Sequence, residues 1–185
     1  MTLLGRLLIN RRADEAHAAW NRPNLNGSES LTVTSRQFDD GGSMPLVCCM
    51  KTVGGEDKSP HLAWTPPPAG TAELLLVMED LDVPTPKPVV HCAALLDPAV
   101  GQLEPGALNG KHPGSGVRLL RSGIGRGYHG PGPIKGHGPH RYTFQLFALG
   151  NPVGGNAERE RPRALLSAVT APVLGRGRLT GVYER

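Results

Sequence analysis

Aromatic side chains are scarce in this sequence: two tryptophans, three tyrosines and three phenylalanines among 185 residues. A surface that stacks nucleic-acid bases needs several aromatic rings, so this scarcity disfavours that class of protein. Runs of five or more basic residues are also missing, and the net charge is only +4. Such a mild basic bias suits small acidic ligands without calling for nucleic acid, and no nucleic-acid partner is predicted.

Cysteines and long apolar runs are equally rare. Cys48, Cys49 and Cys92 are the three cysteines; an odd, small number makes no disulfide framework and is typical of a reducing compartment. The chain has no apolar run near the ~18 residues of a membrane-spanning helix. The apolar start, MTLLGRLLINRR, is broken by Gly5 and Arg6 and is too short for a secretory signal core. We therefore expect a cytoplasmic protein without stable membrane insertion.

Glycine and proline, by contrast, are abundant, with 25 and 18 residues. Both are costly inside helices, which excludes a helical bundle or coiled coil and favours many short elements joined by structured loops. The length is that of one ordinary domain, large enough to bury a core. The sequence therefore predicts a single β-rich domain, mainly β or α+β, over residues 1–185.

Hydrophobic patterning places the expected elements. Alternating or continuous apolar runs predict strands, and apolar residues at helical spacing predict helices. The expected strands are residues 31–38, 46–52, 73–79, 89–96, 141–149 and 177–183; the expected helices are residues 11–20 and 163–174. Residues 98–140 form a long Gly/Pro-rich region, and loops of that length in a compact domain are usually functional.

Ligand-type side chains concentrate in two segments. The first, residues 79–84 (EDLDVP), follows an apolar run, and His91 lies within the next such run. The second begins with residues 127–133 (GYHGPGP) and continues to residues 138–142 (GPHRY). Taken singly, each has a simpler explanation: aspartates after a strand often form turns, a histidine in an apolar run is often a core residue, and Gly-Pro repeats often form tight loops.

A metal site is a further alternative for these histidines and aspartates. The sequence has no His-x-His or His-x3-His spacing. Cys92, next to His91 on a strand, is expected to point to the opposite face of the sheet. No metal site and no cofactor are therefore predicted.

Together, these segments resemble the phosphatidylethanolamine-binding protein (PEBP) family, also called the Raf kinase inhibitor-like family, and its bacterial branch in particular. Residues 54–64 (GGEDKSPHLAW) are similar to the family's G-x-x-x-S-P-x-L-x-W segment, and residues 80–84 (DLDVP) to its D-P-D-x-P motif. Residues 127–142 resemble its G-Y-x-G-P-x-P…G-x-x-H-R-Y signature. His91 stands where the bacterial branch has a pocket histidine, and the closing TGVYER resembles the family's last strand.

The resemblance implies a central antiparallel sheet with a second, smaller sheet, and a small surface pocket at one end. It covers a core of residues 31–185, which leaves residues 1–30 as an N-terminal extension with a short helix. With the helices expected above, the predicted fold is a PEBP-like domain with peripheral N- and C-terminal helices.

The implied pocket draws its ligand-binding residues from strand ends and one loop: Asp80, His91, His129, Gly130, Gly132, Pro133, His140 and Tyr142. Glycine N–H groups in the loop can approach an anion closely, and an imidazole paired with Asp80 has its orientation fixed. Three neighbours are expected to be structural: Asp82 and Pro84 in the turn, and Arg141 on the strand face opposite His140.

The expected function is non-enzymatic binding of a small anion, such as phosphate, a carboxylate or a phosphorylated headgroup like phosphoethanolamine. The family's description as inhibitors implies a protein kinase or serine protease partner. A catalytic residue is not predicted, because there is no G-x-S-x-G elbow, P-loop or dinucleotide fingerprint. Cys92 in an apolar run is expected to have a raised thiol pKa, unlike a reactive cysteine.

Alternatives remain open from the sequence. The chain is a small hydrolase or lyase if His91 or His140 acts as a general base with Asp80 behind it. A homodimer is a candidate assembly. Val89, Val90 and Cys92 stand where the bacterial branch often has aromatic residues, so the polar residues of the pocket are kept while its aromatic walls are lost.

Overall fold

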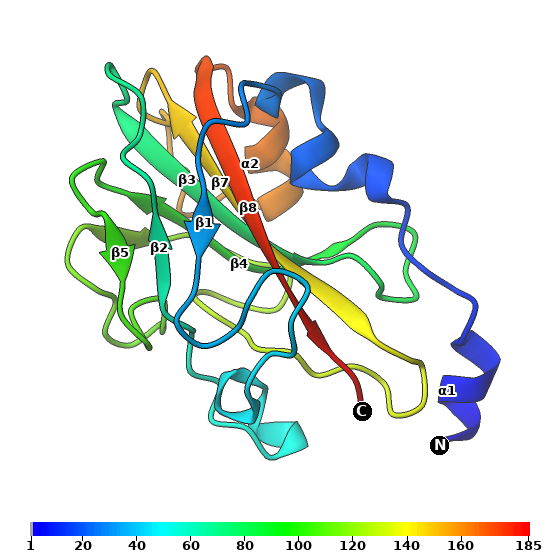
Figure 1. Ribbon diagram of the computed structural model, residues 1–185. Helices are drawn as coiled ribbons and strands as arrows, with labels where there is room; N and C mark the ends of the chain where they lie inside the picture. The colour runs from blue at the N-terminus through cyan, green and yellow to red at the C-terminus, as the bar shows by residue number, and fades with distance from the viewer. Residues whose placement is uncertain (1) are drawn as a thin grey trace.

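The computed structural model describes residues 2–185; Met1, the first residue of the predicted extension, lies outside the described part. Two antiparallel sheets form the centre of the molecule (Figure 1). The larger sheet has the strand order β6-β4-β3-β7-β8 and the smaller one the order β1-β2-β5. The strands are β1 Val33–Thr34, β2 Leu62–Trp64, β3 Glu73–Asp80, β4 Val89–Leu96, β5 Gln102–Leu103, β6 Val117–Leu119, β7 His140–Leu149 and β8 Val173–Tyr183.

The central strands read as continuous apolar runs because both of their faces are buried. Along β3, Leu74, Leu76 and Met78 belong to a core shared with the smaller sheet. Leu75 and Val77 belong to a second core. That second core includes residues of helix α2, Pro162–Ala168, and of the turns near the N-terminus. The predicted β-rich fold with a central and a smaller sheet is confirmed, as are the strands expected over residues 73–79, 89–96 and 141–149.

The helix predicted over residues 11–20 is wrong. The N-terminal helix, α1, spans Leu3–Leu8, and three 3-10 turns follow it at Glu15–His17, Ala19–Asn21 and Pro23–Leu25. Two side chains of the large sheet accept hydrogen bonds from backbone N–H groups that would donate to backbone carbonyls in an α-helix. Ala19 N–H donates to Glu79 Oε2 at 2.7 Å, and Trp20 N–H donates to Gln145 Oε1 at 2.6 Å. Tertiary contacts thus override the local helix propensity.

Other expected elements differ in length or type. The strand expected over residues 46–52 is wrong: Leu46–Cys48 and Lys51–Val53 are 3-10 turns, in which Cys48 and Cys49 donate to the carbonyls of Pro45 and Leu46 at 2.9 Å. The strand expected over residues 31–38 shrinks to β1. The C-terminal helix ends at Ala168, earlier than expected, because β8 begins at Val173. Among residues 2–185, no helix has the length and apolar character needed to cross a membrane.

The N-terminal turns are anchored by a buried acid. Glu79 is fully buried, forms an ion pair with Arg163 at 3.0 Å and accepts from Gln145 Nε2 at 2.9 Å as well as from Ala19. Replacing Glu79 by alanine is expected to lower the free energy of unfolding by about 3 kcal/mol. The reason is that Arg163 would lose its ion-pair partner and the Ala19 N–H its acceptor. Urea unfolding followed by circular dichroism measures this loss.

Glu104 offers the matched control. It pairs with Arg36 at 2.7 Å, but both side chains are largely exposed, at 60% and 61%. The Glu104→Ala variant is expected to lose less than about 1 kcal/mol. Equal losses in the two variants would show that Glu79 does not anchor the N-terminal turns.

Candidate functional site

The antiparallel pairing of β3 with β7 brings an acid and a histidine together. Asp80 ends β3 and lies directly opposite Tyr142, and His140 begins β7 two residues earlier on the same face. His140 Nδ1 lies 2.8 Å and 3.0 Å from the two carboxylate oxygens of Asp80. Because a carboxylate accepts, Nδ1 of His140 carries the proton that joins the pair. The side chains are only 2% and 5% exposed, so this contact is shielded from water.

His91 joins this group through an irregularity in β4. Met78 pairs with Cys92 and Glu79 pairs with Val90, so His91 is an extra residue without a partner in the β3–β4 register. Such a bulge re-aims a side chain. The His91 ring packs edge-on against Tyr142 at 5.3 Å between centroids, and Cys92 lies in the same core as Tyr142. The expectation that His91 and Cys92 point to opposite faces is therefore wrong, because the bulge breaks the alternation.

A third histidine, His137, occupies the outer side of His140. His137 Nδ1 lies 2.6 Å from His140 Nε2, so both ring nitrogens of His140 have protein partners. His137 is fully buried. Burial, with Arg12 and His140 nearby, lowers the pKa of His137 below its ordinary value. A ligand that bonds to His140 must therefore displace His137.

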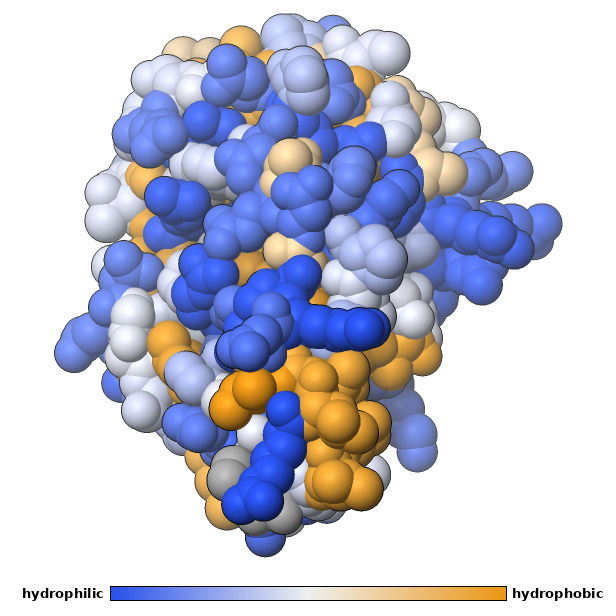
Figure 2. Space-filling view, turned by 90° about the vertical axis from the view of Figure 1, so that its right-hand side faces the viewer, coloured by the Kyte–Doolittle hydropathy of each residue, from blue (hydrophilic) through white to orange (hydrophobic). Residues whose placement is uncertain are grey.

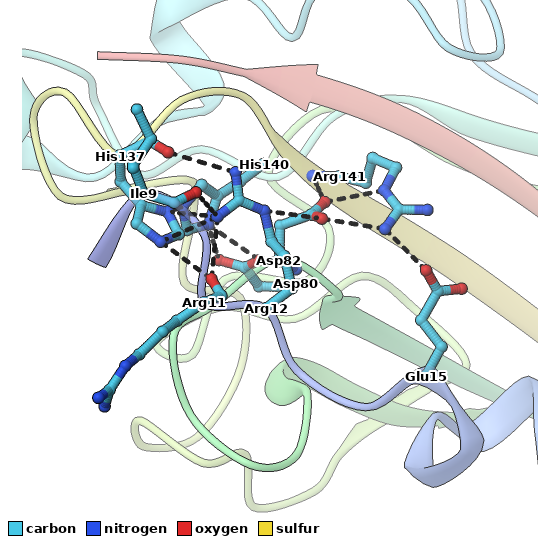
Figure 3. Close-up of polar contacts among 9 residues, drawn as sticks. All are labelled: Ile9, Arg11, Arg12, Glu15, Asp80, Asp82, His137, His140 and Arg141. Carbon is cyan, nitrogen blue, oxygen red and sulfur yellow. Dashed lines mark hydrogen bonds and ion pairs between the residues drawn. The ribbon is translucent and has the colours of Figure 1, made fainter. Parts of the chain in front are cut away.

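The N-terminal segment covers this chain of contacts from outside (Figure 3). Arg12 Nη1 lies 3.0 Å from His137 Nε2, and Arg12 Nη2 donates to the carbonyl of the same residue at 3.2 Å. Arg12 also forms an ion pair with Asp82 at 3.4 Å. His137 therefore covers Nε2 of His140, and Arg12 lies over His137, while the open surface pocket expected from the sequence stays a prediction. Neither residue was expected in the site, although His137 lies only three positions before His140.

The tautomers along this chain follow from the partners. Arg12 can only donate, so its contact favours a bare Nε2 on His137 and a proton on Nδ1, which then donates to His140. The carbonyl of Arg11, 3.1 Å from the same Nε2, favours the opposite tautomer. In that second tautomer the bare Nδ1 of His137 would face the bare Nε2 of His140, whose proton is on Nδ1, so the 2.6 Å contact between the rings favours the tautomer in which His137 Nδ1–H donates to His140.

Asp82 and Arg141 brace the edge of the site. Arg141 donates to both carboxylate oxygens of Asp82, at 2.8 Å and 2.9 Å, and to Glu15 at 2.7 Å. Burial alone raises the pKa of the Asp82 carboxyl, but the hydrogen bonds from Arg141 outweigh it and lower that pKa. Asp80 also accepts from Asp82 N–H at 2.9 Å. Pro84 lies half-buried in the connection between β3 and β4.

The loop at residues 129–133 packs against the chain instead of opening as an anion nest. Gly130 N–H donates to Asp57 Oδ1 at 2.6 Å, so this N–H already has an anionic partner. A Cβ at Gly130 would lie 2.0 Å from the Cys48 carbonyl oxygen, and one at Gly132 would lie 2.6 Å from Met50 Sδ. In this structure Gly130 permits close packing, and its expected ligand contact stays a prediction. Pro133 is buried beside it.

His129 contributes its backbone to the site. Its carbonyl lies 2.9 Å from His91 Nδ1, and its own ring lies 4.0 Å from Asp57 Oδ2. Because a carbonyl only accepts, Nδ1 of His91 carries the proton. Burial lowers the pKa of His91, outweighing the opposite influence of Asp80. His91 is therefore neutral near pH 7, with an Nε2 that bears a lone pair.

One buried polar atom at the centre of the site lacks a hydrogen-bond partner in the described residues. Tyr142 Oη is buried and makes no hydrogen bond to residues 2–185. Burial and the nearby Asp80 carboxylate raise the pKa of Tyr142 far above its ordinary value, so its O–H remains a donor; the Gly132 backbone and Asp80 lie close enough to influence this pKa but not in hydrogen-bond geometry. His91 bonds through Nδ1 to the His129 carbonyl, and its Nε2 does not belong to the buried unpaired atoms of the described residues. Buried polar groups are rarely left unpaired in folded proteins, so the unpaired Tyr142 hydroxyl, on a ring that packs against His91, indicates space for a ligand group.

Metal binding has no structural support in the described part of the chain. Residues 2–185 contain no group of three or more histidine, cysteine, aspartate or glutamate side chains arranged to hold a metal ion. The three cysteines are buried and unpaired with one another. Burial raises the pKa of Cys92 to about 12, which keeps the thiol protonated.

Curated bacterial proteins resemble the chain along most of its length. A "UPF0098 protein" of Aquifex aeolicus is 29% identical over 184 residues, which is 99% of each protein. A protein of Mycobacterium tuberculosis described as "Putative lipoprotein LppC" is 32% identical over 161 residues, covering 85% of this chain and 74% of the relative.

Solved structures give the same result. YbcL of Escherichia coli, described as a new member of the mammalian PEBP family, matches with a TM-score of 0.74 and 27% identity, over 84% of this chain and 98% of its own. The putative PEBP homologue CT736 of Chlamydia trachomatis matches with a TM-score of 0.69 and 25% identity, over 85% and 99%. The family model described as "Phosphatidylethanolamine-binding protein" matches residues 34–184. The chain thus belongs to the phosphatidylethanolamine-binding protein family.

Proposed function

We propose that this protein is a non-enzymatic binding protein that holds a small phosphate-bearing or carboxylate-bearing ligand between Tyr142, His91 and His140. The carrying observation is the buried Tyr142 hydroxyl, which lacks a hydrogen-bond partner and belongs to a side chain whose ring packs against His91. An anion that accepts from Tyr142 would satisfy this donor in a site of low polarity, where hydrogen bonds to charged groups are strong. Family membership supports a ligand-binding role in general.

The protonation of His91 favours phosphate over a carboxylate. Neutral His91 offers a bare Nε2, which repels a fully ionised oxygen but accepts from a protonated one. A phosphate monoanion carries its own proton, because the second pKa of a phosphate group is about 6. A phosphorylated headgroup such as phosphoethanolamine shares this chemistry with free phosphate. By family analogy, occupancy of the site would alter a contact with a partner kinase or serine protease.

The alternative of a hydrolase or lyase has one favourable feature, the Asp80–His140 pair at 2.8 Å. A general base must reach the proton that it removes. Within residues 2–185 His140 bonds to no hydroxyl or thiol that it could activate. Binding is therefore the better-supported function.

The Tyr142→Phe variant tests the proposed ligand contact. It is expected to weaken phosphate binding by about 1.5–3 kcal/mol, the value of a hydrogen bond to a charged group. Its free energy of unfolding is expected to stay the same or rise, because the deleted hydroxyl has no partner in the ligand-free protein. Calorimetric titration with inorganic phosphate and with phosphoethanolamine measures the first effect, and urea unfolding the second.

Tyr128 provides the matched control, since its buried hydroxyl donates to the Cys48 carbonyl at 2.8 Å. Tyr128→Phe is expected to reduce stability by about 1 kcal/mol and to leave phosphate affinity unchanged. Native affinity in Tyr142→Phe would remove the basis of the proposed function, as would the absence of binding by the native protein at millimolar phosphate.

Binding is also expected to depend on pH. The pKa of His91 is lowered in the free protein, whereas an adjacent anion raises it, so phosphate binding takes up a proton or selects the protonated phosphate. Affinity should therefore rise as pH falls from about 8 to about 6.5, the ordinary histidine range. Titrations in two buffers of different ionisation enthalpy measure the proton uptake. A pH-independent affinity with no proton uptake would contradict this mechanism.

Removing the histidine that covers His140 is expected to tighten binding. In His137→Ala the ligand no longer displaces a hydrogen bond of about 1 kcal/mol, so phosphate affinity should increase about fivefold. His112, which is exposed in a distant loop, serves as the control for loss of an imidazole. Weaker phosphate binding in His137→Ala, with native binding in the His112 control, would contradict the prediction and mean that His137 is itself a ligand contact.

A further inference from the structure

Exposed apolar side chains gather at one place on the surface. In the described chain the large exposed hydrophobic residues are Leu3, Leu4, Leu7, Ile9, Leu46 and Ile124, and the first four belong to α1 and its C-cap. Leu3 and Leu7 are the most exposed, at 77% and 71%. Figure 2 shows a continuous apolar area at the lower end of the face toward which α1 projects. A patch of this kind marks an interaction site.

The way α1 is attached keeps this apolar face turned outward. Gly5, the buried residue of the helix, lies so close to the loop that a Cβ there would be 2.3 Å from the Lys135 carbonyl oxygen. Thr2 Oγ1 donates to the same carbonyl at 2.8 Å and accepts from Gly5 N–H at 3.1 Å. Leu3, Leu4 and Leu7 share one helix face by their spacing, and that face is not the one attached to the loop.

Positive charge surrounds the apolar face. Residues 2–13 contain three arginines and no acidic residue. Arg6 and Arg11 are exposed, and their side chains make no hydrogen bond or ion pair to residues 2–185. Lys135, on the loop that holds the helix, is exposed as well. Arg12 is directed inward, to His137 and Asp82. A short apolar helix face with basic flanks is the arrangement of segments that bind at the surface of anionic membranes.

We propose that α1 docks on a membrane surface that contains anionic lipid, with Leu3, Leu4 and Leu7 entering the headgroup region and Arg6, Arg11 and Lys135 contacting lipid phosphates. Charge complementarity favours this occupant over a second copy of the chain. In a symmetric pair of α1 faces, the basic residues of the two copies would meet one another, and like charges without intervening acids oppose association. The proposal does not depend on the anion site at Tyr142.

Vesicle flotation tests the proposal with the full-length chain. The native protein is expected to float with vesicles of phosphatidylcholine and phosphatidylglycerol, to remain unbound with phosphatidylcholine alone, and to dissociate as salt is raised. The double variant Leu3→Ser/Leu7→Ser is expected to lose at least about tenfold in partitioning, because two apolar side chains no longer enter the bilayer. Arg6→Glu is expected to lose at least about fivefold, given the contribution of each basic residue near an anionic surface.

Two control variants test whether vesicle binding depends on α1 itself or on any exposed apolar or basic side chain. Leu46→Ser removes an apolar side chain that is 51% exposed outside α1, and Lys111→Glu reverses an exposed charge in a distant loop; both are expected to bind vesicles as the native protein does. A native circular dichroism spectrum and an unchanged urea midpoint for Leu3→Ser/Leu7→Ser would show that the variant is folded. Equal binding to neutral vesicles, no binding to either kind, or a dimer in sedimentation that only this double variant abolishes would each overturn the proposal.

Discussion

The carboxylate of Asp80 is the group on which the arrangement of the site depends. It accepts the Nδ1 proton of His140, which fixes the ring and leaves Nε2 facing His137. The same carboxylate accepts from the backbone N–H of Asp82. Asp82 in turn binds Arg141 and Arg12. One buried acid at the end of β3 therefore organises the histidines on one side and the N-terminal segment on the other.

The buried strands could be predicted because their signal is local. Continuous apolar runs predicted β3 and β4, and an alternating run predicted β7. These three strands position Asp80, His91, His140 and Tyr142. The motif resemblance implied the central antiparallel sheet and the smaller second sheet. In both cases the information lies within a few neighbouring residues, where hydrophobic periodicity and turn chemistry are decisive.

The remaining features depend on contacts between residues far apart in the chain. The backbone N–H groups of Ala19 and Trp20 donate to the side chains of Glu79 and Gln145, which lie 60 and 125 residues away, instead of to helical carbonyls. Arg12 and His137 are likewise separated by 125 positions. Propensity and spacing carry no information about such contacts. The same holds for Asp57, whose carboxylate binds the Gly130 N–H that the sequence assigned to a ligand.

The bulge at His91 has a consequence for chain length. A regular ladder between β3 and β4 would need one residue fewer between Val90 and Cys92, where His91 has no partner. The site needs that residue, because the extra position lets the His91 imidazole depart from the regular alternation of side chains between the two sheet faces and pack against Tyr142. A deletion here would improve the sheet and remove the site. A substitution in β4 must therefore fit the volume of the core. The length of β4 is fixed by a different requirement, because one extra residue is needed to direct the His91 side chain toward Tyr142.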